Sequence, residues 1–283
     1  MKWMTLIIAS CALWAQDNRL DQATHFPSRN GQSVERDKNA ANVEKYLAHV
    51  SVNDQWKSTL LIRSDAKYDQ RISLFFYGPD GRPARAQFST TDGASFQSEG
   101  FNIDLTGYEI FGISFQNLNN WPSMQVVAVT SENDRFYSIE NTYNRYDGSY
   151  KLAAVGTLAT ESFPKFLMDM DERIDSYSHQ QKFRGFAIFN PSSDPCNCDV
   201  LLYDHGPEGA NTIEEVARVS MNPIPANGKW LGYAIDLFPQ IDNQLPKGFG
   251  YIYTECDRSV SVIGLSFEEN SPMTGSVPVE YLE

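Results

Sequence analysis

Basic residues are scarce in this chain of 283 residues: 23 Lys and Arg stand against 36 Asp and Glu, and the formal net charge is −13. A protein that binds nucleic acid needs a basic face to neutralise phosphates, so we expect no nucleic-acid partner. Long apolar runs are also lacking. The run at residues 3–14 is too short to span a membrane, and no later segment is apolar for long enough, so no transmembrane span is predicted.

Recognisable catalytic motifs are missing as well. The sequence contains no Gly-x-Ser-x-Gly nucleophile elbow, no His-Glu-x-x-His zinc motif and no glycine-rich phosphate loop. Among four histidines, His205 is the best candidate for an acid or base, because Asp204 precedes it at the end of a predicted strand and Glu208 follows. A solvated turn is the favoured interpretation. We therefore predict no catalytic residues and a protein that is not an enzyme; a secreted hydrolase acting on glycans is the alternative.

The N-terminus has the pattern of a signal peptide. One positive charge at Lys2 precedes the apolar run, and Ala15 precedes a polar segment, so cleavage is expected after residue 15. The order Ile8-Ala9-Ser10-Cys11 also resembles a lipoprotein cleavage box, which would make Cys11 a lipid-bearing N-terminus. Export to a periplasm, a cell surface or the medium is predicted, and residues 16–45 are expected to form a polar tether.

Cysteine is rare, with four in the whole chain. After cleavage Cys196, Cys198 and Cys256 remain, and an exported chain tends to pair its thiols. We predict a disulfide between Cys256 and one member of the Cys-x-Cys pair, with Cys198 as the candidate. A zinc site made of the three thiols is the alternative, although no histidine lies at a supporting spacing.

Short alternating segments rich in Phe, Tyr, Val and Ile recur every 8–12 residues and predict an all-β chain. Residues 56–83 and residues 182–209 share one plan: a strand, a polar turn, a second strand, and then a turn with Gly, Pro and an acid. We predict two tandem antiparallel β-sandwich domains, residues 46–150 and residues 151–283. Tight hairpins are expected at residues 78–81 and at Asp257-Arg258.

Several turns resemble those of tandem β-sandwich repeat modules, Ig-like or jelly-roll-like, that occur in secreted bacterial surface proteins. They are Phe163-Pro164, Phe189-Asn190-Pro191-Ser192 and Pro225-Ala226-Asn227-Gly228-Lys229. In the first module the match is looser, because Arg63-Ser64-Asp65 stands where Asn-Pro-Ser is expected. Such modules carry no shared catalytic residues, and the resemblance implies an adhesive, accessory or scaffolding role.

Candidate ligand-binding residues are the aromatic side chains that could stack on a sugar and the amides beside them. They are Trp121, Asn119, Asn120 and Trp230. Packing over the end of a sandwich is the other interpretation of the tryptophans.

The acidic stretch with Asp169, Asp171 and Asp175 offers clustered oxygens for a structural calcium ion, the one cofactor considered. The predicted function is surface binding, adhesion or assembly, with a cell-surface protein or glycan as partner. A carbohydrate-binding module or subunit of a secreted hydrolase is the alternative.

Overall fold

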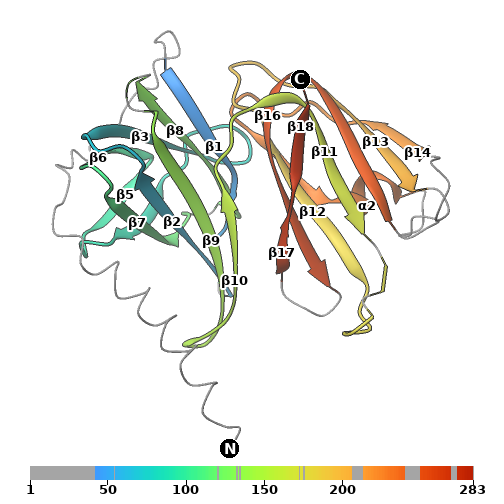
Figure 1. The fold of residues 1–283 in the computed structure, drawn as a ribbon, viewed down its shortest axis with the longest axis horizontal. Coiled ribbons are helices and arrows are strands. Elements are labelled where there is room, and N and C mark those ends of the chain that lie inside the picture. Colours follow the sequence, from blue (N-terminus) through green and yellow to red (C-terminus); the bar gives the residue numbers. More distant parts are fainter. Residues whose placement is uncertain are drawn as a thin grey trace, which may run out of the picture.

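The computed structural model describes residues 42–205, 213–239, 249–268 and 273–282, apart from residues 54, 120, 132, 134, 172 and 175. The predicted signal peptide and almost all of the tether lie outside these residues. The described chain is nearly all strand, with one short helix, α2 (Ala234–Leu237). Its antiparallel sheets form two sandwiches that lie side by side (Figure 1). The predicted all-β class with two sandwiches is confirmed.

The first sandwich has a sheet of four strands facing a sheet of six. In spatial order the smaller sheet contains β1 (Asn42–Val50), β8 (Met124–Ser131), β3 (Gln70–Tyr77) and β6 (Gly100–Leu105). The larger sheet contains β10 (Tyr150–Leu158), β9 (Tyr137–Asp147), β2 (Trp56–Ser64), β7 (Ile110–Asn117), β4 (Ala86–Thr90) and β5 (Ser95–Ser98). The expected boundary after residue 150 falls at the start of β10, which pairs with β9 and so extends the sheet of this sandwich.

The second sandwich is built around one long strand, β16 (Phe249–Glu268), which takes part in both of its sheets. One sheet has the order β14 (Ile213–Ser220), β13 (Cys198–His205), β16, β11 (Phe163–Asp171) and β18 (Val279–Leu282). The other contains β15 (Lys229–Tyr233), β12 (Lys182–Phe189), β16 and β17 (Met273–Val277).

The two sandwiches share one strand order, to which the first adds β4 and β5 and the second adds β18 at sheet edges. The order β1-β8-β3-β6 corresponds to β11-β16-β13-β14, and β10-β9-β2-β7 corresponds to β17-β16-β12-β15. The similar segments noted in the sequence, residues 56–83 and residues 182–209, thus supply equivalent strands, β2 with β3 and β12 with β13. In each copy the two strands belong to opposite sheets.

The predicted hairpin at Asp257-Arg258 is wrong. Residues 249–256 pair with β11 and β13, residues 261–268 pair with β12, and the strand passes without a break from one sheet to the other. In the first sandwich the same passage is divided between β8 and β9, which are separate strands in opposite sheets. The alternation of apolar residues fits both arrangements, so the sequence pattern alone does not separate them.

The predicted turn at residues 78–81 forms, but its return strand goes elsewhere. Gly81 N–H donates to Gly78 O over 2.9 Å, and Gly81 has φ of +84°, a conformation that glycine tolerates best. Beyond the turn only an isolated bridge, Tyr77 to Pro83, continues the pairing. The expected return strand, residues 85–89, crosses to the opposite sheet as β4 and pairs with β7.

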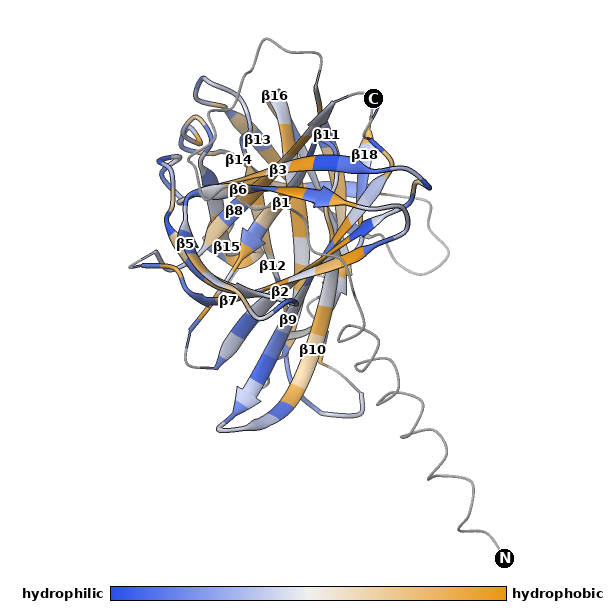
Figure 2. Cartoon of the chain, turned by 90° about the vertical axis from the view of Figure 1, so that its left-hand side faces the viewer, coloured by the Kyte–Doolittle hydropathy of each residue, from blue (hydrophilic) through white to orange (hydrophobic). Residues whose placement is uncertain are grey.

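Hydrophobic and hydrophilic residues follow each other along many of the strands, as the hydropathy colours in Figure 2 show. Each sandwich encloses its own core; Phe76, Phe88 and Phe115 stack edge to face in the first, and Phe166 and Phe186 are fully buried in the second. Some strands are buried on both faces. In β8, for example, every residue from Met124 to Thr130 is buried, because both faces of the strand are covered.

A third apolar cluster explains this double burial. Alternate residues of β1, β3 and β8 point away from the first core and pack against β12 and the second half of β16. We call this contact between the sandwiches the seam. Its buried members are Tyr46, Ala48, Phe75, Val127, Val129, Tyr143, Val155, Ala187, Phe189, Ile263 and Leu265.

The turn at residues 78–81 closes one end of the seam, and this gives a prediction for Gly81→Ala. An added Cβ would lie 1.8 Å from the carbonyl oxygen of Ala226 in the other sandwich. Gly93→Ala is the matched control, because Gly93 has φ of +81° and nothing within 4 Å of an added Cβ. The control should lose about 1–2 kcal/mol of unfolding free energy from backbone strain. Gly81→Ala should lose about 1–3 kcal/mol more from the overlap. Equal losses in denaturant titrations would contradict the contact between the turns.

Candidate binding site

Two of the turns singled out in the sequence contact each other across the seam. The backbone N–H of Lys229 donates to Pro79 O over 2.9 Å. The side chain of Gln125, which is fully buried, donates from Nε2 to Gly78 O and to Asn227 O, each over 2.6 Å. These bonds satisfy backbone carbonyls that the contact removes from water. The turns therefore act as the polar fastening of an otherwise apolar interface.

A lysine without a carboxylate partner in the described structure lies inside the seam. Lys229 is 6% exposed, and its Nζ donates to Met124 O over 2.9 Å and lies 3.2 Å from His49 Nδ1. Burial lowers the pKa of Lys229 well below its usual 10.5. Burial, and then the neighbouring Lys229, lower the pKa of His49 well below 6.5. The pair is thus held by hydrogen bonds between groups that the interior favours in their neutral forms.

Beside His49 the seam opens into a cavity of about 260 Å³, which we call the seam cavity. Its walls come from both sandwiches: the end of β1, the start of β2 and β9 on one side, and β12, β15 and β16 on the other. The lining residues are His49, Ser51, Trp56, Tyr143, Gly185, Phe186, Leu231, Gly232, Tyr233, Leu265 and Phe267. An apolar cavity of about 150 Å³ is enough to hold benzene, so this one has room for a larger ring system.

The chemistry of the seam cavity is aromatic and uncharged. Trp56, Tyr143, Phe186, Tyr233 and Phe267 supply rings, and among the described lining residues there is no carboxylate, thiol, lysine or arginine. The Tyr143 hydroxyl donates to the backbone carbonyl of His49 over 2.6 Å, and burial raises the pKa of Tyr143. Such walls favour a neutral and largely apolar ligand with few polar groups.

A second hollow, of about 580 Å³, lies between β10 and the strands β16, β17 and β18. Its lining contains one aromatic residue, Tyr281, and one carboxylate, Glu140. It therefore lacks the dense aromatic wall that distinguishes the seam cavity.

The candidate sugar-binding residues Trp121 and Asn119 contact other residues of the chain. The ring of Trp121 is half-buried and packs against the first core. It lies so close to Gly78 that a Cβ added to this glycine would be 2.6 Å from the ring. The guanidinium of Arg82 lies 5.5 Å from the centre of the ring. The amide of Asn119 donates from Nδ2 to Arg85 O over 2.6 Å and so holds the loop. Asn120 lies outside the described residues. The sugar-binding role of this group stays a prediction.

Trp230 belongs to the second core, where its ring lies 4.8 Å from that of Phe186. The structure therefore places Trp121 and Trp230 against different cores. Phe186 lines the seam cavity, so Trp230 supports the wall of that cavity from behind.

Of the predicted calcium ligands, Asp171 is already paired with cations of the chain. Arg173 Nε lies 2.9 Å from Asp171 Oδ1, and Lys182 Nζ lies 3.6 Å from Oδ2. Burial alone would raise the pKa of Asp171, but the hydrogen bonds and charge of Arg173 and the charge of Lys182 outweigh it and lower the pKa to about 2. Asp169 is exposed on β11. Asp175 lies outside the described residues, so the calcium site stays a prediction.

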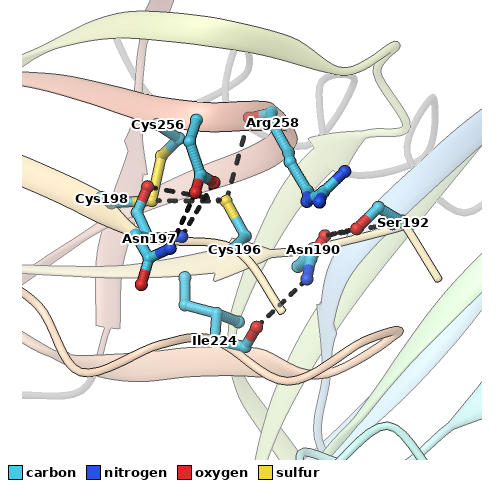
Figure 3. Close-up of a disulfide and its surroundings, with 9 residues drawn as sticks. Asn190, Ser192, Cys196, Asn197, Cys198, Ile224, Cys256 and Arg258 are labelled. Carbon is cyan, nitrogen blue, oxygen red and sulfur yellow. Dashed lines mark hydrogen bonds between the residues drawn. A yellow bond between two sulfur atoms is a disulfide. The ribbon is translucent and has the colours of Figure 1, made fainter. Parts of the chain in front are cut away.

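The predicted pairing of Cys198 with Cys256 is present as a disulfide (Figure 3). The two residues are directly opposite each other on β13 and β16, with 4.1 Å between their Cα atoms. Cys196 stays free and fully buried, 3.8 Å from Cys198 Sγ. Burial, together with Asp257, raises the pKa of the Cys196 thiol to about 12, which keeps it protonated and inert at neutral pH.

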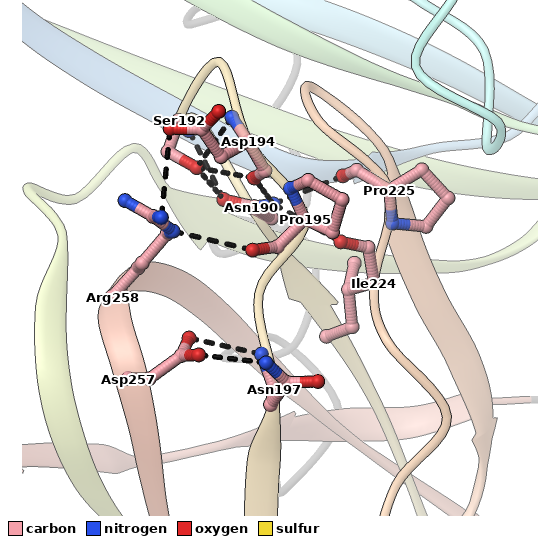
Figure 4. Close-up of polar contacts among 9 residues, drawn as sticks. All are labelled: Asn190, Ser192, Asp194, Pro195, Asn197, Ile224, Pro225, Asp257 and Arg258. Atoms are coloured by element: carbon pink, nitrogen blue, oxygen red, sulfur yellow. Dashed lines mark hydrogen bonds and ion pairs between the residues drawn. The ribbon is translucent and has the colours of Figure 1, made fainter.

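The loop before the disulfide is held by Asn190, the first residue of the Asn-Pro-Ser motif. Its Nδ2 donates to the carbonyl oxygens of Asp194, Ile224 and Pro225 over 2.8–3.1 Å, and its Oδ1 accepts from Ser192 (Figure 4). The motif is thus a structural device, since a fully buried amide replaces water around three backbone carbonyls.

The sequence makes His205, beside Asp204 and Glu208, the best candidate for an acid or base. Asp204 is buried at the end of β13. The side chain of His205 and the whole of Glu208 lie outside the description of the structure. The residues that the sequence does not single out as a site are those of the seam: His49 stands in no recognisable motif, and Lys229 appears only as the last residue of the turn Pro225-Ala226-Asn227-Gly228-Lys229. The signal that marks the seam is the run of adjacent apolar residues in β3, β8 and β12, typical of strands buried on both faces.

Comparisons of the chain with models of protein families, with curated proteins and with solved structures found no match. Within the described residues, none of the helices has the length and apolar character needed to cross a membrane.

The lowered pKa of Lys229 gives a prediction about pH. Between the folded pKa and the ordinary 10.5, the unfolded chain binds a proton that the folded chain does not, so stability falls as pH decreases by up to about 1.4 kcal/mol per pH unit. Below pH 6.5 His49 adds to the loss with the same sign. Lys229→Met should be more stable than wild type at pH 7, and the difference should shrink as pH rises toward 10.5.

Denaturant titrations at pH 6–10 measure this, with Lys57→Met, the loss of an exposed lysine on β2, as the control. Parallel curves for wild type and Lys229→Met would show that Lys229 is not held neutral.

The sulfur atoms give a second prediction. Peptide mapping without reduction should find Cys198 joined to Cys256. Cys196 should resist alkylation in the native protein at pH 7 and react once the chain is unfolded, because it is buried and protonated. Rapid native alkylation of Cys196 would be inconsistent with this environment.

Proposed function

We propose that this protein is an exported, non-enzymatic binding protein that takes a neutral, ring-bearing ligand into the seam cavity. The observation that carries the proposal is the cavity itself, which has a volume of about 260 Å³ and is walled by five aromatic residues from two sandwiches. Its described lining contains no carboxylate, lysine or arginine, and burial favours the neutral form of its one histidine, His49, by lowering the pKa. Ligand pockets commonly lie between domains and combine apolar walls with a few polar groups.

The wall chemistry favours an apolar ligand over a saccharide. Sugar hydroxyls need several hydrogen-bonding side chains, whereas the polar side chains that line the cavity are those of His49, Ser51, Tyr143 and Tyr233. The Tyr143 hydroxyl is already used by the backbone carbonyl of His49. An aromatic ring inserted between Trp56 and Phe267 would instead bury apolar surface at about 25 cal/mol per Å².

Support for export comes from the disulfide, since such bonds persist in oxidising compartments, and from the signal-peptide pattern at residues 1–15. Both are compatible with a role at a cell surface or in the medium. A partner protein or glycan bound elsewhere on the surface remains part of the wider prediction of adhesion or assembly.

The test is a titration of the purified protein with N-phenyl-1-naphthylamine, a neutral aromatic dye whose emission rises in apolar surroundings. We expect saturable binding and a change in tryptophan emission from Trp56. Leu231→Gln should weaken binding by on the order of tenfold, because it places an amide in the apolar wall.

Ile110→Gln is the matched control, since Ile110 is 41% and Leu231 48% exposed, and Ile110 does not line the cavity. Absence of saturable dye binding, or equal loss in both variants, would refute the proposal. Binding of neutral oligosaccharides that depends on Trp121, without dye binding, would favour the carbohydrate-binding alternative.

A further inference from the structure

Three cysteines of the second sandwich form one compact cluster. Their sulfur atoms all lie within 4.8 Å of one another, and Cys196, Cys198 and Cys256 are each no more than 5% exposed. Cys198 and Cys256 share the disulfide, so Cys196 is left beside the bond with its sulfur 3.8 Å from that of Cys198 (Figure 3). Cys196 takes no part in the disulfide, and it does not line the seam cavity.

The spacing of the unbonded sulfur atoms fits a metal ion. Zinc binds thiolates at about 2.3 Å in a tetrahedral arrangement, which places neighbouring sulfur atoms about 3.8 Å apart. Cys196 and Cys198 already have this separation. Cys256 is directly opposite Cys198 on the neighbouring strand, so opening the disulfide leaves its sulfur free to move to the third corner with little change in the backbone.

The residue that follows Cys256 in the chain supplies a carboxylate next to the cluster. Asp257 follows Cys256 and accepts hydrogen bonds from Asn197 through its backbone N–H, over 2.9 Å, and its Nδ2, over 2.7 Å. After burial, this carboxylate is the next cause of the raised pKa of the Cys196 thiol, so the two groups interact. Asp257 is exposed whereas the three cysteines are buried, so its carboxylate offers both an oxygen ligand and a path of entry for a cation.

We propose that Cys196, Cys198, Cys256 and the carboxylate of Asp257 form a site for one thiophilic metal ion, such as Zn²⁺, when the disulfide is open. Opening takes two electrons: a dithiol reductant is oxidised to its own disulfide, and Cys198 and Cys256 become thiols. The ion then replaces the protons of the thiols. Metal and disulfide exclude each other, so the site belongs to the chain before oxidation or in a reducing compartment. The proposal does not rest on the seam cavity.

The experiment uses the full chain with Cys11→Ser, so that only the three cluster cysteines are present. The protein is reduced with dithiothreitol, desalted without oxygen, and mixed with Zn²⁺; bound metal is measured after a second desalting, and affinity by competition with a chromogenic chelator. Reduced protein should retain about one Zn²⁺ per chain, and oxidised protein none. Retention by the oxidised protein equal to that of the reduced protein, or no retention by either, would overturn the proposal.

Variants identify the ligands. Cys196→Ser keeps the disulfide pair but should lower the affinity of the reduced chain by on the order of 100-fold, and Asp257→Asn by on the order of tenfold. Asp194→Asn is the matched control, because this carboxylate pairs with Arg258, 3.5 Å away, and removing its charge tests the general effect of losing a nearby negative charge (Figure 4). Unchanged affinity in Cys196→Ser would show that Cys196 is not a ligand.

The circular dichroism spectrum of the reduced chain shows whether opening the disulfide unfolds the protein. If the reduced chain is folded, Zn²⁺ should raise its melting temperature, and if it is unfolded, Zn²⁺ should restore the β spectrum, because metal binding and folding are coupled. In both cases Cys196→Ser should respond far less. Failure of Zn²⁺ to do either in the reduced parent protein would also overturn the site.

Discussion

The burial of one sheet of each sandwich against the other is the constraint on which the rest of the structure depends. It covers the second face of β3, β8 and β12, it removes Lys229 and His49 from water, and it creates the seam cavity at its edge. Apolar contact alone has no direction, so two such faces could slide over each other. The bonds from Gln125 and Lys229 to backbone carbonyls of the facing turns fix the position, because an unmet buried carbonyl would be costly.

The buried Lys229 lowers the stability of the protein but helps to define how the two sandwiches are arranged. A methionine would fill the space of Lys229 without an amine, yet the amine donates to Met124 O and contacts His49 Nδ1, both on the first sandwich. These bonds require the two sandwiches to meet in one register, so the lysine exchanges stability for a defined arrangement. The same arrangement sets the shape of the seam cavity, since His49 is part of its wall.

Much of the fold could be predicted from the sequence, and the reasons are local. The alternation of apolar residues and the turn residues identify β2, β3, β12 and β13 and reveal the duplication. The signal-peptide pattern, which predicts export, and the small number of cysteines together predict the disulfide between Cys198 and Cys256. The passage of β16 between sheets could not be predicted, because Asp257-Arg258 fits a hairpin as well as a continuous strand and only pairing with β12 decides. The cavity was missed for a similar reason: its walls come from residues as far apart in the chain as His49 and Phe267.

The duplication also explains where the chemistry-bearing residues accumulate. In the first sandwich the passage between sheets is divided between two strands, β8 and β9, whereas in the second the backbone runs straight through as β16. The disulfide holds β16 to β13 immediately before this passage, and Asp257 and Arg258 bind the facing loop through Asn197 and Pro195 O (Figure 4). Each half of β16 pairs in a different sheet of the second sandwich. The contacts of Cys256, Asp257 and Arg258 hold the strand where it leaves one sheet for the other. The cysteine cluster lies at that point, and the strand that leaves it continues to Leu265 and Phe267 in the wall of the seam cavity.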